Sequence, residues 1–132
     1  MSLNSGKRWL TFDCYDTLVR YTESKFAAMT DLISAKGGTK DLVESAWSVF
    51  QSSERRLQTE DFLPLNQVLK TSLKFALNKI GLDPTSSDED KMLSAVKDAD
   101  PFPEVNQVLS ELKQDYQIAI LSNSEPDIIR FN

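Results

Sequence analysis

The pattern of hydrophobic and polar positions divides the chain into a short apolar strand, a long helical stretch and a second strand. An apolar run leads from Trp9 to Asp13, and the segment from Tyr116 to Leu121 is apolar at nearly every position. Apolar runs of this length are typical of strands in parallel sheets, which are buried on both faces. We therefore expect a β-strand in each segment, with the second one buried on both faces.

Between these strands, apolar residues recur at the three- and four-residue spacing of amphipathic helices. The predicted helices cover residues 22–36, 41–58, 66–80, 87–99 and 104–114. Gly37 and Gly81 follow two of them, as is common at helix C-termini. Pro101-Phe102-Pro103 forces extended backbone and marks the clearest boundary in the chain. The order predicts an α/β domain in which a βαβ unit is interrupted by four inserted helices.

Composition narrows the classes of protein that the chain could represent. Its 132 residues suffice for one modest core, and its net charge of −5 argues against a nucleic-acid-binding face. No apolar stretch approaches the length of a membrane span, and the N-terminal residues lack the apolar core of a signal peptide. We therefore expect a cytoplasmic protein that binds neither nucleic acid nor membrane.

The chain contains one cysteine, Cys14, and no histidine. This composition rules out an internal disulfide, offers no metal-ligand spacing, and removes the Ser-His and Cys-His pairs of common nucleophilic enzymes. Catalysis would depend on carboxylates, Lys or Tyr. No basic partner is near Cys14 in the sequence, so we interpret it as a small buried residue of the first strand region.

Polar residues follow both predicted strands. Asp13 ends the first strand with Thr17 four residues later, and Ser122 and Asn123 end the second. The carboxyl ends of parallel strands lie at one edge of the sheet, where α/β proteins bind ligands. Asp13 is therefore a candidate nucleophile, with Thr17 as the residue that orients it. An ordinary solvated turn after a strand is the alternative interpretation.

The segment Phe12-Asp13-Cys14-Tyr15-Asp16-Thr17-Leu18, the inserted helices, Pro101-Phe102-Pro103 and Leu121-Ser122-Asn123 together resemble the haloacid dehalogenase superfamily. The resemblance is to the branch with an α-helical cap between the first two motifs. It implies an α/β fold in which residues 1–20 and 100–132 form a partial Rossmann-like core. Residues 21–99 would then form the four-helix cap.

The resemblance also implies a chemistry. Superfamily phosphatases carry a second aspartate two residues after the nucleophile, and this position holds Tyr15, as in 2-haloacid dehalogenases. Asp13 would attack the halogen-bearing carbon, giving an ester that water hydrolyses, while Thr17 holds the Asp13 carboxylate. Tyr15, Ser122 and Asn123 would bind the small-molecule substrate, a 2-haloacid, and no cofactor would be required.

Two alternatives stay open. The first is a Mg²⁺-dependent phosphatase that acts on a small phosphomonoester, with Asp16 or a water replacing the missing acid. The second is a non-catalytic fragment that binds a partner or forms a homo-oligomer through an exposed edge of the core. Ser48 stands where the dehalogenases carry a cap arginine, which leaves the nearby arginines as candidates: Arg20, Arg55 and Arg56.

The resemblance further implies two later motifs, one with a lysine and one with acidic residues. The sequence ends at Asn132, shortly after the second motif. We therefore expect a truncated chain whose catalytic activity is lost or impaired.

Overall fold

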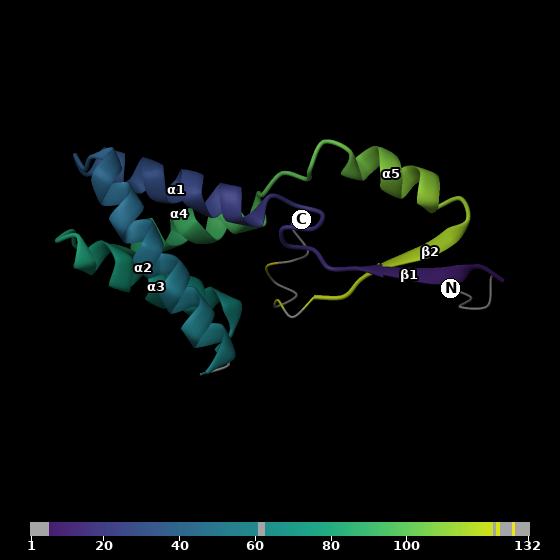
Figure 1. Ribbon diagram of the computed structural model, residues 1–132, viewed down its shortest axis with the longest axis horizontal. Coiled ribbons are helices and arrows are strands. Elements are labelled where there is room, and N and C mark those ends of the chain that lie inside the picture. Colours follow the sequence, from purple (N-terminus) through teal and green to yellow (C-terminus); the bar gives the residue numbers. More distant parts are fainter. Residues whose placement is uncertain (1–5, 61–62, 123, 125–127, 129–132) are drawn as a thin grey trace.

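The computed structural model describes residues 6–60, 63–122, 124 and 128, and its elements form two modules (Figure 1). The helical module consists of α1 (Tyr21–Ala35), α2 (Lys40–Thr59), α3 (Leu65–Lys79) and α4 (Ser86–Lys97). The strand module consists of β1 (Arg8–Phe12), α5 (Val105–Leu112) and β2 (Tyr116–Ile120). This is the predicted α/β class, a partial Rossmann-like core with an inserted set of four helices.

The strand module is a parallel β1–α5–β2 unit. The two strands pair in register from Arg8 opposite Tyr116 to Phe12 opposite Ile120. The pairing continues one residue further, because the Leu121 amide donates to the Phe12 carbonyl at 2.9 Å. Since the strands are parallel, the residues after β1 and after β2 leave the sheet at the same edge.

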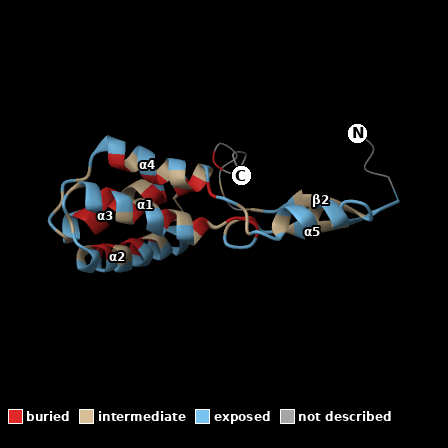
Figure 2. Cartoon of the chain, turned by 90° about the horizontal axis from the view of Figure 1, so that it is seen from above, coloured by how far each residue is buried: buried red, intermediate tan, exposed pale blue. Residues whose placement is uncertain are grey.

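The prediction that the second strand is buried on both faces is wrong for the described residues. The first four residues of β2 are only half-buried, Ile120 is 50% exposed, and Leu121 beyond it is 72% exposed. The described sheet has two strands with α5 beside it, and α5 itself has no buried residue (Figure 2). The described elements therefore leave apolar residues of β2 partly exposed.

The helical module has a dense core. Amphipathic stripes on all four helices meet there. Its largest fully buried side chains include Phe50, Met29, Leu32, Ile33, Leu69, Leu73, Leu77, Met92 and Val96. Ile128, which follows β2 in the sequence, is also buried in this core. In Figure 2 the buried positions concentrate in α1–α4. None of the described helices is both long and apolar enough to cross a membrane.

A second, smaller core joins the modules. It contains Cys14, Leu18, Val19 and Ala99. Two backbone hydrogen bonds connect the segments that run between the modules: the Arg20 amide donates to the Asp100 carbonyl at 2.8 Å, and the Phe102 amide donates to the Leu18 carbonyl at 3.0 Å. Cys14 is buried, as predicted, and burial followed by the charge of Asp13 raises the pKa of its thiol. A protonated thiol is a poor nucleophile.

Candidate functional site

A cavity of about 400 Å³ lies at the carboxyl end of β1, between the loop that follows this strand and the helical module. Its walls come from both modules: Asp13, Tyr15, Asp16, Tyr21, Gln58, Leu63, Leu65 and Ser124. The loop and the segment after β2 contribute mainly polar groups. The helical module contributes an aromatic ring, one amide and two aliphatic side chains. The cavity therefore pairs candidate chemical groups on one side with a mixed wall of Tyr21, Gln58 and two leucines on the other.

Asp13 and Thr17 lie together, as the sequence predicted. The Thr17 hydroxyl donates to Asp13 Oδ2 at 3.2 Å. A tight turn makes this contact possible, because the amides of Leu18 and Val19 both donate to the Cys14 carbonyl, at 2.8 and 3.2 Å. The turn brings the chain back so that a hydroxyl four residues along the sequence reaches the strand tip.

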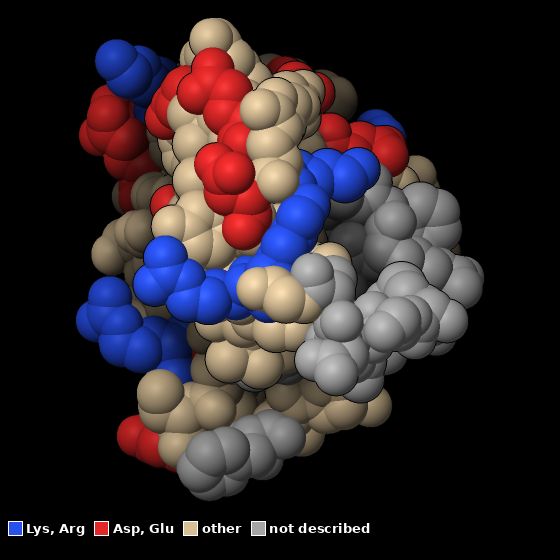
Figure 3. All heavy atoms as spheres, turned by 90° about the vertical axis from the view of Figure 1, so that its right-hand side faces the viewer, with Lys and Arg blue, Asp and Glu red and all other residues tan. Residues whose placement is uncertain are grey.

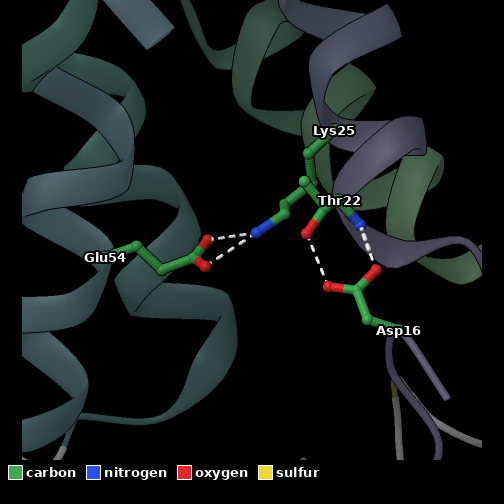
Figure 4. A network of polar contacts seen from close by, with 4 residues as sticks. All are labelled: Asp16, Thr22, Lys25 and Glu54. Atoms are coloured by element: carbon green, nitrogen blue, oxygen red, sulfur yellow. Dashed lines mark hydrogen bonds and ion pairs between the residues drawn. The ribbon is translucent and has the colours of Figure 1, made fainter. Parts of the chain in front are cut away.

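Asp16 has a structural role in the loop after β1. Its φ angle is +60°, a left-handed conformation that glycine adopts without strain and that Asp tolerates better than most residues. Its carboxylate accepts from the Thr22 amide at 2.8 Å and from the Thr22 hydroxyl at 2.5 Å (Figure 4). The N-cap residue of α1, Arg20, makes no side-chain cap. Asp16 thus satisfies a free amide in the first turn of α1 from outside the helix.

Tyr15 and Tyr21 form the aromatic wall of the cavity. Their rings stack with centroids 4.5 Å apart and planes inclined by 25°. Tyr21 is 7% exposed, and burial, followed by the charges of Glu54 and Asp16 and by its contact with Tyr15, raises its pKa well above the usual value. Tyr21 is consequently a neutral phenol at any physiological pH.

Lys25 and Glu54 form an ion pair directly behind this wall. The Lys25 ammonium donates to both carboxylate oxygens of Glu54, at 2.6 and 2.7 Å (Figure 4). Lys25 is 2% exposed, and its Nζ lies 3.7 Å from the centroid of the Tyr21 ring. Burial lowers the pKa of Lys25, although the charge of Glu54 opposes the change. The pair thereby connects α1, α2 and the aromatic wall.

The segment after β2 reaches the cavity through Ser124. The Ser124 hydroxyl is buried and has no hydrogen-bond partner among the described residues. Its backbone amide donates to Ser122 Oγ at 3.2 Å. Ser122, a predicted substrate ligand, is half-buried and is not one of the residues that line the cavity. Asn123, the other predicted ligand of this segment, lies outside the described residues.

None of the described lining residues is a Lys or Arg. Arg20 lies over the Phe102 ring and pairs with Glu23 at 3.6 Å, and Arg56 lies over the Phe75 ring. Arg55 lines a small neighbouring cleft that shares Gln58 with the cavity. Of the three arginines that the sequence left as candidates, Arg55 is therefore the one beside the site.

Basic side chains also occur at the far end of the sheet. There Lys7 and Lys113 line a groove of about 670 Å³ between α5 and the strands. Figure 3 views the molecule from this end, where Lys and Arg side chains spread over the surface next to acidic ones. Asp13 is not part of this groove, so its size alone does not make it a candidate for the chemistry.

The described residues contain no group of three or more His, Cys, Asp or Glu side chains placed to bind a metal. Asp13 and Asp16 both line the cavity, and each oxygen of Asp16 accepts one hydrogen bond from Thr22.

The fold is an α/β domain with a helical insertion between its first strand and the crossover helix. The sequence profile of haloacid dehalogenase-like hydrolases matches residues 7–131, and the chain belongs to this family. No curated protein matches the chain by sequence.

Solved structures similar to the chain include three informative ones. The L-2-haloacid dehalogenase from Xanthobacter autotrophicus has 25% identity and a TM-score of 0.70, over 95% of this chain and 50% of that one. The defluorinating L-2-haloacid dehalogenase Rha0230 has 22% identity and a TM-score of 0.74, over 95% and 54%. The putative HAD-hydrolase YfnB from Bacillus subtilis, bound to magnesium, has 18% identity and a TM-score of 0.74, over 95% and 57%. The chain thus spans about half the length of these proteins.

Proposed function

We propose that the chain carries the nucleophile and the substrate-facing helices of a hydrolase of the 2-haloacid dehalogenase type. The observation that carries this proposal is the Asp13 carboxylate, held by Thr17 at the strand tip and followed two residues later by Tyr15. The similarity to the Xanthobacter L-2-haloacid dehalogenase supports the same chemistry. The activity belongs to the whole protein, because the chain spans about half of such enzymes.

In the proposed mechanism, one oxygen of Asp13 attacks the halogen-bearing carbon of a 2-haloacid. A carbon–oxygen bond forms as the carbon–halogen bond breaks, and the halide leaves with the bonding electrons. Thr17 holds Oδ2, which leaves the other oxygen for the attack. Water then adds to the carbonyl carbon of the ester, releasing the 2-hydroxyacid and a proton and restoring Asp13. Halide is a stable anion, so the reaction needs no acid at Tyr15.

We further propose that residues 21–99 act as a cap over a core made of residues 1–20 and 100–132. In this arrangement the core supplies Asp13 and the polar groups after β2, among them Ser122 and Asn123 as substrate ligands. The cap supplies the mixed wall, and its two leucines fit the small carbon skeleton of a 2-haloacid. A cytoplasmic location stays a prediction from the sequence.

The direct test is isotopic. A single turnover of 2-chloropropionate in H₂¹⁸O is expected to place ¹⁸O in the carboxyl group of Asp13, which mass spectrometry of the peptide detects, because water attacks the enzyme ester. Asp13→Asn is expected to abolish chloride release, and Thr17→Val is expected to slow it about tenfold or more by freeing the carboxylate. Label found only in the product, or chloride release unchanged in Asp13→Asn, would refute the nucleophile assignment.

The phosphatase alternative draws on Asp16, which lines the cavity beside Asp13, and on the magnesium-bound hydrolase YfnB. Its weakness is that Thr22 holds the Asp16 carboxylate. Phosphate release from small phosphomonoesters that stops with chelator and in Asp16→Asn would favour this alternative. Chloride release that persists under both conditions would favour the dehalogenase.

The binding alternative draws on the exposed apolar residues of the strand module, among them Trp9, Ile120 and Leu121. Such residues at strands invite association with another chain. A stable oligomer of defined size that turns over neither a 2-haloacid nor a phosphomonoester would favour this alternative.

A further inference from the structure

The Lys25–Glu54 pair is buried next to the candidate site, but neither residue lines the cavity. The pair meets the site through Tyr21, because the Lys25 ammonium lies 3.7 Å from the centre of that ring. On the cavity side, Tyr21 stacks on Tyr15. A continuous series of contacts therefore runs from Glu54 on α2 to the residue two positions after Asp13.

Apolar side chains also hold α1 and α2 together in the helical core. Both helices already contribute fully buried apolar side chains, Met29 from α1 and Phe50 from α2. A buried ion pair loses hydration and is often no more stable than apolar residues of the same volume. The pair instead gives the ammonium a defined position, because two charge-assisted hydrogen bonds hold it. An ammonium held over an aromatic face attracts that ring.

We infer that Lys25 and Glu54 are positioning residues that hold the Tyr21–Tyr15 stack in place and thereby set the shape of the wall that the substrate meets beside Asp13. The effect on substrate choice rests on the proposed function, whereas the effect on the stack does not. Without the pair, the wall loosens, so the site loses its preference for small 2-haloacids over those with bulky groups at C2.

Four variants separate this role from a simple link between helices. Lys25→Met/Glu54→Leu removes both charges together and avoids leaving one buried charge unpaired. Lys25→Glu/Glu54→Lys keeps an ion pair between α1 and α2 but takes the ammonium off the Tyr21 side. Lys36→Met is the matched control, because Lys36 pairs α1 with Asp88 of α4 at 3.1 Å and does not line the cavity. Lys25→Arg is the conservative variant.

The first measurement follows the stack itself. Aromatic NMR spectra, assigned by Tyr15→Phe and Tyr21→Phe, report the mutual ring-current shifts of the two tyrosines. Both the neutral pair and the swapped pair are expected to move these resonances toward ordinary values. Lys36→Met is expected to leave them in place, and Lys25→Arg to retain most of the shift. Unchanged tyrosine resonances in the folded neutral pair would overturn the inference.

The second measurement follows selectivity, through the dissociation constants of 2-chloropropionate and 2-chloro-3-phenylpropionate. The ratio of the two constants is expected to move roughly tenfold toward the bulky acid in the neutral pair, the scale of a small mismatch in an apolar pocket, and to stay constant in Lys36→Met. Resonances that move with a constant ratio would overturn the claim about the wall. A wild-type chain that binds neither acid contradicts the proposed function, and the tyrosine resonances then still decide whether the pair holds the stack.

Discussion

The two modules bury similar residues to different extents. Ile33 of α1 is fully buried, whereas Ile120 of β2 is 50% exposed. The four helices of the helical module surround a complete core, whereas α5 has no buried residue and the described strands are half-buried at most. The difference shows that the residues that stabilise the fold and the candidate nucleophile lie in different modules of this chain. The helices provide most of the buried apolar area, while Asp13 extends from the poorly covered strands.

The candidate site lies where these modules meet. Asp13 and Ser124 follow strands, Tyr21 begins the first helix, and Asp16 joins the two by capping that helix from the loop. The geometry of the site therefore depends on the helical module more than on the sheet. This dependence can be tested by perturbing each module in turn.

The largest expected effect separates the two modules directly. Leu73→Ala in α3 removes a fully buried side chain and is expected to lower the free energy of unfolding by about 3–5 kcal/mol, because it leaves a cavity in the core. Leu121→Ala makes the same chemical change at a site that is 72% exposed, and is expected to stay within about 0.5 kcal/mol. Urea unfolding of the two variants measures both values. Equal losses would contradict the contrast between the modules.

The next effect concerns the loop that joins them. Asp16→Ala is expected to destabilise the protein by about 2 kcal/mol, because it removes the cap of α1 and places a residue less tolerant of positive φ at this position. Asp16→Asn keeps an acceptor oxygen and a side chain suited to this conformation, and is expected to cost less than about 1 kcal/mol. Thermal unfolding measures the difference. Equal losses in the two variants would show that neither the acceptor oxygen nor the backbone conformation accounts for the loss of stability.

The sequence predicted the elements well because helical periodicity survives in every helix. The predicted 41–58 became α2 at Lys40–Thr59, and the predicted strand at 116–121 became Tyr116–Ile120. The contact between Asp13 and Thr17 was predictable because it is local, four residues apart after a strand. The exposure of β2 was not predictable, since an apolar strand in a sequence does not reveal how many neighbours cover it.

The contacts behind the site were missed because they join distant positions. Lys25 lies on the buried stripe of α1 between Tyr21 and Met29, at spacings of four residues, and Glu54 lies between Phe50 and Leu57 on α2. A charge on the apolar face of one helix, and an opposite charge on the apolar face of the next, were the available signal. The stacking of Tyr15 on Tyr21 left no such signal, because it depends on the path of the loop between them.

A smaller effect tests the stability of the helical module against pH. Burial alone would raise the pKa of Asp88, but hydrogen bonds from Lys36 and Thr85 outweigh it and hold the pKa below its usual value. The unfolded chain therefore binds the proton more readily, and the stability that Asp88 contributes above about pH 4 is lost as the pH falls below that value. Asp88→Asn is expected to cost about 1 kcal/mol at pH 7 and much less near pH 2.5. Urea unfolding at both pH values measures this.

The matched control for that measurement is Glu89→Gln. Glu89 is the neighbouring acid in the first turn of α4, and it pairs at 3.2 Å with the exposed Lys74. Because Lys74 is 56% exposed, solvent screens this pair, and the variant is expected to change the free energy of unfolding by less than about 0.5 kcal/mol. A loss in Asp88→Asn that is the same at both pH values would contradict the assignment of the titrating group.

The smallest change in stability, and the clearest readout for the strand module, is expected from Ile120→Lys. Ile120 is half-exposed, so its replacement is expected to alter the free energy of unfolding by less than about 0.5 kcal/mol. A lysine on a poorly covered strand opposes pairing with a second chain, so self-association measured by sedimentation velocity is expected to fall. Phe75→Lys places the same charge at a residue of α3 that is 45% exposed, and is expected to leave association unchanged. An equal decrease in both variants would mean that copies of the chain meet through general surface hydrophobicity, and the uncovered strands would then have no special part in assembly.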